Sequence, residues 1–276
     1  MKEGLTVAMN KQPQDVITCE GIKKYIDSEV MSRINIEYLK ETESTNDIVK
    51  KRATQGEKEG LLVIAGEQTS GKGRLGRSFF SPGDTGVYMS LLLRPKIKPS
   101  DAVLITTAAA VSVCEAFEKL GVKKPQIKWV NDIFVNNKKV CGILTEASFG
   151  ADINTLDYAV LGVGVNMYEP ENSFPEEIKD IAGAVFSRKS EDLRNKFVAY
   201  FINSFFDCYE NLESKKHCTS YAERCFVIGK DINVISGDSI KPAKALSVDE
   251  NCGLLVRFDN GETAVLNSGE ISIRTV

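Results

Sequence analysis

The sequence has few of the residues from which catalytic and metal sites are most often built. Its 276 residues include one histidine, His217, and seven cysteines that form no C-x-x-C pair. We therefore expect neither a zinc site nor a disulfide framework, and the odd cysteine count fits a reducing, cytoplasmic setting. His217 follows Lys215 and Lys216, which predicts a surface position and excludes histidine-based catalysis.

Excess positive charge and long apolar runs are also missing. Lys and Arg total 35 against 38 Asp and Glu, so no overall basic field favours nucleic acid. The apolar stretch at 102–117 is interrupted by Thr106, Thr107 and Ser112, which predicts a core helix rather than a membrane span. The first 15 residues lack the apolar segment of a secretory signal.

Hydrophobic periodicity predicts one large unit of mixed strands and helices, followed by a small β module. Strands are expected at 34–39, 61–65, 87–93, 127–130, 133–135, 140–145 and 158–165. Helices are expected at 20–28, 44–54, 99–120 and 191–211. After residue 224 short strands alternate with polar turns, and Asp259-Asn260-Gly261 is typical of a hairpin. We expect a catalytic domain at 1–224 and a β domain at 225–276.

The most distinctive segment is a glycine- and arginine-rich loop after the strand at 61–65. Residues 66–72 have the G-x-x-x-x-G-K spacing of a P-loop, but position 73 is glycine, so the hydroxyl that would hold Mg²⁺ is missing. Three glycines and Pro82 between residues 74 and 86 also prevent the helix that a P-loop requires. What remains is a loop suited to close contact with an anion, or alternatively an exposed basic turn. Its cations are Lys72, Arg74 and Arg77.

We expect residues 71–82 to be mobile without ligand. Their glycines make the loop costly to order, and no acidic run lies nearby in the sequence to pair with its cations. Phe79 and Phe80 follow the cations and predict either a hydrophobic lid or plain core.

Polar residues gather at a second place, around the predicted hairpin. Lys128, Asn131, Asp132 and Lys139 would lie near one end of a sheet, as part of a site or as solvated decoration. Cys141 has no general base at hand in the sequence, which favours a small buried residue over a nucleophile.

A short glycine pattern follows in the strand at 158–165. Gly162-x-Gly164-x-Asn166 lacks the third glycine of a dinucleotide fingerprint. It predicts a strand that a ligand or another strand approaches closely.

In this order the segments resemble the biotin–protein ligases, which attach biotin to a lysine of carboxylase carrier domains. The resemblance runs from about residue 36 to the end and rests on six motifs. These are E-S-T-N at 43–46, G-K-G-R-L-G-R at 71–77, K-W-V-N-D at 128–132, K-K-V-C-G-I-L at 138–144, G-V-G-V-N at 162–166 and G-E-I-S-I-R at 269–274. It implies an α+β fold, with helices on one face of a mixed sheet as in class II synthetases, plus a C-terminal SH3-like β-barrel.

The resemblance also implies the ligand contacts. Biotin would meet Ser44, Thr45, Asn46, Gln68, Lys72, Gly73, Arg74, Lys139 and Gly142. ATP would meet Arg74, Arg77, Phe79, Asn131, Asp132 and Asn166. Lys139 and Arg74 would be catalytic, because they neutralise the biotin carboxylate and the α-phosphate as these two anions are brought together. Mg²⁺ would accompany the phosphates, and the resemblance does not name its protein ligands.

Three positions depart from the family pattern. Lys72 stands where arginine is usual, Val130 where proline is usual, and Phe79 where tryptophan is common. Lys72 keeps the charge but loses the fork-shaped guanidinium. The implied reaction needs no protein nucleophile, because the biotin carboxylate itself attacks the α-phosphate, and closure of the glycine-rich loop would shield biotinyl-adenylate from water.

The implied partner is a biotin carboxyl carrier protein or domain. Many relatives carry an N-terminal winged helix and act as repressors, but the 43 residues before Ser44 hold 6 Lys and Arg against 8 Asp and Glu. We therefore expect a ligase without DNA binding. A homodimer could form through sheet edges near Gly142 or Asn166. The rival functions are lipoate or octanoate attachment, a biotin-responsive DNA regulator, and an interaction module without catalysis.

Overall fold

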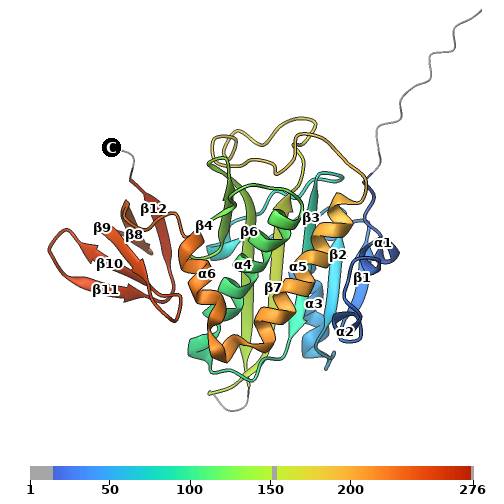
Figure 1. Ribbon diagram of the computed structural model, residues 1–276, viewed down its shortest axis with the longest axis horizontal. Helices are drawn as coiled ribbons and strands as arrows, with labels where there is room; N and C mark the ends of the chain where they lie inside the picture. The colour runs from blue at the N-terminus through green and yellow to red at the C-terminus, as the bar shows by residue number, and fades with distance from the viewer. Residues whose placement is uncertain (1–14, 151–153, 275–276) are drawn as a thin grey trace, which may run out of the picture.

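The computed structural model describes residues 15–150 and 154–274, and its main body is built on a seven-stranded sheet (Figure 1). The strands are β1 (Asn35–Leu39), β2 (Leu61–Ala65), β3 (Gly86–Leu93), β4 (Gln126–Lys128), β5 (Asp132–Val135), β6 (Lys138–Phe149) and β7 (Leu156–Asn166). Their order across the sheet is β1-β2-β3-β7-β6-β5-β4. The pair β1–β2 is parallel, and the remaining neighbours are antiparallel, so the sheet is mixed as expected.

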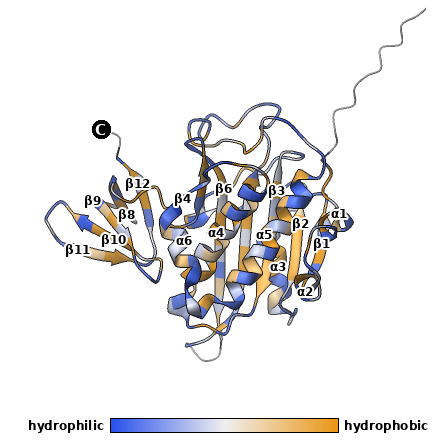
Figure 2. Ribbon diagram, viewed as in Figure 1, coloured by the Kyte–Doolittle hydropathy of each residue, from blue (hydrophilic) through white to orange (hydrophobic). Residues whose placement is uncertain are grey.

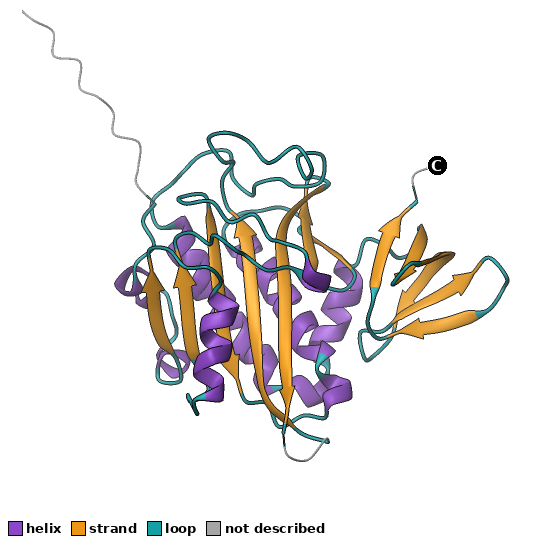
Figure 3. Cartoon of the chain, turned by 180° about the vertical axis from the view of Figure 1, so that it is seen from behind, coloured by secondary structure: helices purple, strands orange, loops and turns teal. Residues whose placement is uncertain are grey.

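Three helices cover one face of this sheet and a fourth covers the other. The first group is α4 (Val103–Lys119), α5 (Leu193–Glu210) and α6 (Lys216–Arg224), which lie in front of the strands in Figure 1. The fourth helix, α3 (Thr45–Thr54), lies on the opposite side, toward the viewer in Figure 3. The expected placement of helices on one face of the sheet therefore holds for α4, α5 and α6, whereas α3 lies on the other face. Both faces of β2 are apolar, so α3 can bury Val49 and Ala53 against Leu61 and Val63.

The core lies between the sheet and α4 with α5. The apolar segment Pro99–Lys119 is the one helical segment among the described residues with the length and hydropathy of a membrane span, and its apolar window is 67% buried. It is a core helix, as predicted. Figure 2 shows the apolar colouring concentrated on the strands and on these packed helices. Cys141 on β6 is fully buried against this core, also as predicted.

Two helical details differ from the expectation. The helix predicted at 20–28 is two short ones, α1 (Cys19–Lys23) and α2 (Ser28–Met31), and α6 was not predicted. His217 lies in the first turn of α6 and is only 5% exposed, so its predicted surface position is wrong. The reason is tertiary: α6 packs on α4, and this places the imidazole Nε2 3.1 Å from Thr107 Oγ1.

The C-terminal residues form a separate five-stranded antiparallel sheet, consistent with a small SH3-like barrel. Its strands are β8 (Asp231–Ser236), β9 (Ser239–Val248), β10 (Leu254–Phe258), β11 (Thr263–Leu266) and β12 (Glu270–Ile273). The order is β11-β10-β9-β8-β12, and β12 lies on the side of the seven-stranded sheet (Figure 1).

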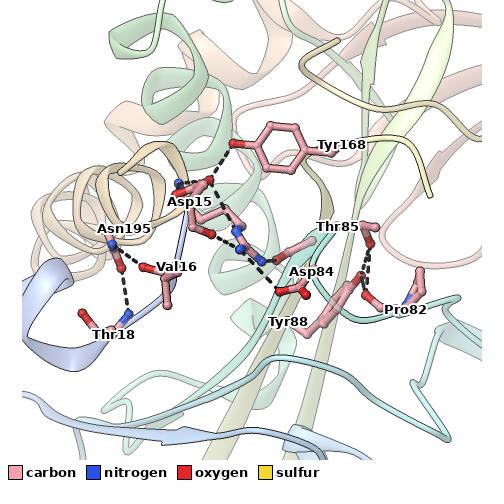
Figure 4. Close-up of polar contacts among 11 residues, drawn as sticks. Asp15, Val16, Thr18, Pro82, Asp84, Thr85, Tyr88, Tyr168 and Asn195 are labelled. Atoms are coloured by element: carbon pink, nitrogen blue, oxygen red, sulfur yellow. Dashed lines mark hydrogen bonds and ion pairs between the residues drawn. The ribbon is translucent and has the colours of Figure 1, made fainter. Parts of the chain in front are cut away.

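A buried ion pair fastens the segment before α1 to the rest of the molecule (Figure 4). Asp15 accepts a hydrogen bond from the Tyr168 hydroxyl at 2.5 Å and faces Arg194 Nε at 3.4 Å. The guanidinium of Arg194 also reaches the Gly86 carbonyl and lies 3.9 Å from Asp84. Burial, together with the hydrogen bond to Asp15, raises the pKa of Tyr168. The start of α5, the start of β3 and the N-terminal segment are thus held at one point.

The sheet edges are not where a strand-paired dimer was expected. Gly142 on β6 and Asn166 on β7 pair with Gly164 and Gly86, inside the sheet. The expected placement of these two residues at sheet edges is wrong, whereas a homodimer stays a prediction. Among the described strands of the large sheet, β1 and β4 are the edges.

Candidate active site

A cavity of about 140 Å³ is lined by residues at the start of α3, on β6 and β7, in the glycine-rich loop and at the start of β12. It collects residues from segments far apart in the sequence. The predicted site residues that line it are Ser44, Thr45, Asn46, Gln68, Lys72, Gly73, Arg74, Arg77, Phe79, Asn131, Asp132, Lys139 and Gly142.

Asn166 is the exception among the predicted site residues. It sits at the end of β7, where its Nδ2 donates to the Gly183 carbonyl at 3.2 Å and its own carbonyl accepts from Val185 N. It does not line the cavity. A nucleotide contact at Asn166 stays a prediction.

One end of the cavity is a network of neutral polar groups at the start of α3. Thr45 donates to Gln68 Oε1 through both its backbone N and its hydroxyl, at 2.9 and 3.0 Å. Ser90 Oγ lies 2.7 Å from Thr45 Oγ1 and 2.5 Å from Asn46 Oδ1, and Asn46 Nδ2 donates to Glu146 at 2.9 Å. Burial acts to raise the pKa of Glu146, but hydrogen bonds from Asn46 and Lys50 outweigh burial and leave it lowered. This end offers both donors and acceptors in fixed directions.

Ser90 and Glu146 were missed by the sequence analysis. Ser90 stands between Met89 and the apolar run L-L-L at the end of β3, and such a buried polar residue needs partners. That signal was available in the sequence. Glu146 carried no such signal, because it sits in a strand of mixed exposure.

The glycines of β6 and β7 make room for side chains that cross the sheet. A Cβ at Gly162 would lie 2.2 Å from Asn46 Oδ1, and one at Gly164 would lie 2.6 Å from the ring of Phe79. A Cβ at Gly142 would meet the same ring at 3.2 Å. The close approach at Gly162-x-Gly164 is present, but the groups that approach are the side chains of Asn46 and Phe79 and not another strand, and approach by a ligand stays a prediction.

The other end of the cavity is cationic. Lys139 Nζ lies 2.7 Å from Asp132 Oδ1, and Arg74 Nη1 donates to Asn131 Oδ1 at 2.9 Å. Lys128 lies in the same wall, and burial lowers its pKa although Asp132 acts in the opposite direction. Lys139, Arg74 and Lys128 thus face the cavity, and Asp132 is the one acidic residue among the described residues of the seven-stranded sheet that line it. Such an excess of positive charge is suited to anions.

The cations of the glycine-rich loop already have partners, contrary to the expectation that no acid lies nearby. Asp47 comes from α3, and Glu270 comes from the C-terminal domain, so a search along the local sequence could not find them. The contacts are Lys72 to Asp47 at 2.5 Å, Arg77 to Glu270 at 2.8 Å and Arg74 to the Gly269 carbonyl at 2.8 Å. The loop is therefore anchored on both sides of the cavity in this structure.

Comparison with known families identifies both domains. Residues 38–166 match the profile described as the Biotin/lipoate A/B protein ligase family. Residues 227–274 match the Biotin protein ligase C terminal domain. This chain belongs to the biotin protein ligase family. The second match separates it from ligases that share only the catalytic fold.

Individual relatives agree with this placement in the biotin protein ligase family. The "Bifunctional ligase/repressor BirA" of Bacillus subtilis is 32% identical over 225 residues, which is 79% of this chain and 68% of that protein. The "Biotin--[acetyl-CoA-carboxylase] ligase" of Mycobacterium tuberculosis is 26% identical over 86% of this chain and 88% of its own. The Aquifex aeolicus biotin protein ligase, solved in complex with biotin and ATP, superposes with a TM-score of 0.71 at 25% identity. That match covers 88% of this chain and 99% of the other.

Proposed function

We propose that the chain is an ATP-dependent biotin–protein ligase that forms biotinyl-5'-AMP and then transfers biotin to a lysine of a biotin carboxyl carrier protein. The observation that carries this proposal is the division of one cavity into a neutral hydrogen-bonding end and a cationic end. Biotin has the complementary layout, with a neutral ureido ring at one end and a carboxylate at the other.

The neutral end takes the ureido ring. Thr45, Asn46 and Gln68 present hydroxyl and amide groups, which match a group that both donates and accepts. Ser44, as the N-cap residue of α3, lies beside them. Gly142, which lies against the Phe79 ring, would border the rest of the biotin molecule, and Lys72 and Gly73 line the cavity from the loop.

The cationic end takes the two reacting anions. A biotin carboxylate oxygen attacks the α-phosphorus of ATP, the bond from that phosphorus to the bridging oxygen breaks, and pyrophosphate leaves. Lys139 and Arg74 lower the repulsion between carboxylate and phosphate, and they stabilise the charge that develops on the phosphoryl oxygens. Arg77, Phe79 and Asn131 form the wall toward the nucleotide.

The carboxylates of the cavity fit a magnesium ion that arrives with ATP. Mg²⁺ is usually held by one or two carboxylates together with substrate phosphates. Asp132 Oδ1 is buried in the cavity wall and has no hydrogen-bond partner besides its ion pair with Lys139 among the described residues, and Glu270 lies across the opening. Asp132 is therefore the residue best placed to hold the ion, which would supply positive charge at the phosphates.

The second step uses a nucleophile from the partner. The ε-amine of the carrier lysine attacks the acyl carbon of biotinyl-5'-AMP, AMP leaves, and the amine gives up a proton. Glu270, paired with Arg77 at the rim, and the exposed tip of the loop at Leu75 lie where a carrier would approach. The carrier of an acetyl-CoA carboxylase is the proposed partner, because relatives are named for that substrate.

We also infer that the chain binds no specific DNA sequence and works in the cytoplasm. Acidic residues outnumber basic ones in positions 1–43, which opposes phosphate binding. The seven free thiols suit a reducing compartment. A gel-shift titration at several salt concentrations tests the first point, and nanomolar, sequence-specific binding with a steep salt slope contradicts it.

ATP–pyrophosphate exchange tests the proposed function directly. Exchange should require Mg²⁺ and biotin, and a purified carrier domain should gain the mass of biotin on its lysine. Exchange that depends on lipoate or octanoate instead of biotin would show that the chain attaches one of those acids and is not a biotin ligase. If none of these acids supports exchange, the hypothesis that remains is an interaction module without catalysis.

A further inference from the structure

Three soft ligand groups meet at the junction of the two domains, apart from the cavity described above. His217 and Cys218 lie in the first turn of α6, and Cys252 lies in the turn between β9 and β10. The imidazole Nε2 is 3.7 Å from Cys218 Sγ, and the two sulfurs are 2.7 Å apart. The three residues are 5%, 4% and 0% exposed, and their donor atoms lie within 4.8 Å of one another.

The fold holds this cluster together from both sides. Cys252 has a φ of 60°, a left-handed conformation that a cysteine rarely adopts. Asp249 fixes that conformation, because its Oδ1 accepts from the backbone N of Asn251 at 2.8 Å and of Gly253 at 2.7 Å. Lys215, at the start of α6, donates to Asn251 Oδ1 and ties the turn to the helix. A strained turn therefore aims one sulfur at the other domain.

The chemistry of the three groups suits a metal ion. Thiolate sulfur and neutral imidazole nitrogen are the forms in which cysteine and histidine bind metals. Because the three donor atoms lie within 4.8 Å of one another in a nearly dry interior, one ion can reach all of them.

We propose that His217 Nε2 and the sulfurs of Cys218 and Cys252 bind one thiophilic cation, Zn²⁺ or Cu⁺. In a zinc site the metal lies about 2.3 Å from sulfur and about 2.0–2.1 Å from nitrogen, so neighbouring ligand atoms are roughly 3.5–3.8 Å apart. The 3.7 Å between His217 and Cys218 meets this requirement. The sulfurs must separate by about 1 Å, which the loss of the Cys252 proton on binding permits.

The two ions differ in how they would complete their coordination by these three protein ligands. Among residues 15–150 and 154–274, no further His, Cys, Asp or Glu joins the group. Zn²⁺ would complete four ligands with water or with Thr107 Oγ1, which lies 3.1 Å from His217 Nε2. Cu⁺ would be satisfied by soft ligands alone.

A metal here would act as a clamp between the domains. It would join α6 of the catalytic domain to the β9–β10 turn of the C-terminal domain. The carbonyl of Cys252 accepts a hydrogen bond from Trp129 Nε1 at 3.1 Å, and Trp129 lines the candidate active site. The clamp therefore also fixes one wall of the cavity.

The full chain, reduced and stripped with a chelator, tests the proposal. It should bind one equivalent of Zn²⁺ in competition with a chromophoric chelator, or one of Cu⁺ under anaerobic conditions, and should unfold at a higher temperature when loaded. Co²⁺ should give a thiolate-to-metal charge-transfer band with the native chain, a readout that needs no variant. Cys218→Ser and Cys252→Ser should each lower affinity by more than about 100-fold, the upper end seen when a mere outer-shell partner is lost. The matched control Cys225→Ser, another buried cysteine outside the cluster, should keep the site.

Two results overturn the proposal. In the first, the native chain binds Zn²⁺ and Cu⁺ no more tightly than a Cys218→Ser/Cys252→Ser double variant does, and Co²⁺ gives no charge-transfer band. The other is an intact mass of the untreated chain lower by two hydrogens, with Cys218 and Cys252 linked in one peptide. That result would show that a peroxide or disulfide oxidant has taken two electrons from the thiols and that the pair is a disulfide. Neither result depends on the ligase reaction.

Discussion

Lys139→Ala removes the cation that pairs with Asp132 at the reactive end of the cavity, and its effect can be worked from the structure. Lys139 Nζ pairs with Asp132 Oδ1 at 2.7 Å, with side-chain exposures of 31% and 18%. If the ammonium also meets the biotin carboxylate and the α-phosphate, its loss removes at least one charge-assisted hydrogen bond. Such a bond contributes about 1.5–3 kcal/mol, so adenylate formation should slow roughly 10–150-fold.

The same variant also costs stability, and the two effects must be measured separately. Without Lys139, Asp132 is left unpaired in the cavity wall, and an unsatisfied buried acceptor costs about 1–3 kcal/mol of unfolding free energy. Single-turnover formation of biotinyl-5'-AMP gives the first quantity, and urea unfolding gives the second. The double variant Lys139→Ala/Asp132→Asn should recover stability, because the unpaired charge is gone, but it should not recover the rate.

The adjacent lysine is the matched control. Lys138 Nζ donates to the carbonyls of Lys179 and Asp180, outside the cavity. Lys138→Ala should therefore leave adenylate formation within about twofold of the native rate, as expected for a surface substitution. A Lys139→Ala rate equal to that of Lys138→Ala would refute the assignment of Lys139 to the reacting anions.

Three further outcomes are expected. Burial lowers the pKa of Lys128 from 10.5, which means that the folded state penalises the charged form. Lys128→Met should therefore raise the unfolding free energy at pH 7, and this gain should disappear as the pH approaches 10.5. Urea unfolding at both pH values measures the gain, and an equal gain at both contradicts the prediction. Gly164→Ala should destabilise the fold by about 1–3 kcal/mol through its clash with Phe79, and adding Phe79→Ala should restore most of the loss in thermal unfolding, whereas purely additive losses would point elsewhere. Trypsin should cut at Arg74 slowly in the free chain and more slowly with biotin plus ATP, as followed by mass spectrometry, and equal rates would mean that residues 71–82 do not close over ligand.

The positions of most strands and of the long helices along the chain could be predicted because their residues carry the signal locally. The run L-L-V-I-A of β2 is apolar throughout, and the spacing in α5 places one aromatic after another on a single face. The side on which α3 packs was not predictable, since β2 is apolar on both faces. His217 was misplaced for a related reason: its neighbours are charged, and only the packing of α6 on α4 buries it.

Most of the cavity lining could be predicted, because its residues lie in the motifs that carry the resemblance to the biotin–protein ligases. What the sequence did not supply was the pairing among them. Asp47 and Glu270 meet the loop only after α3 and the C-terminal domain are in place. Asn166 belongs to the same motif as Gly164, yet at the end of the strand it turns to Gly183 instead of the cavity.

The anchored loop has a consequence for selectivity. Asp47, Glu270 and the Gly269 carbonyl act as internal competitors for the cations that the ligands would use. A ligand then gains only the difference between its own contacts and those it displaces, and its apparent affinity falls in proportion to the fraction of open loop. Biotin alone can replace few of these contacts, whereas biotinyl-5'-AMP offers a phosphate to Arg74 and Arg77 as well. The intermediate is therefore expected to be retained far longer than either substrate, which is what a two-step enzyme requires while it waits for its carrier.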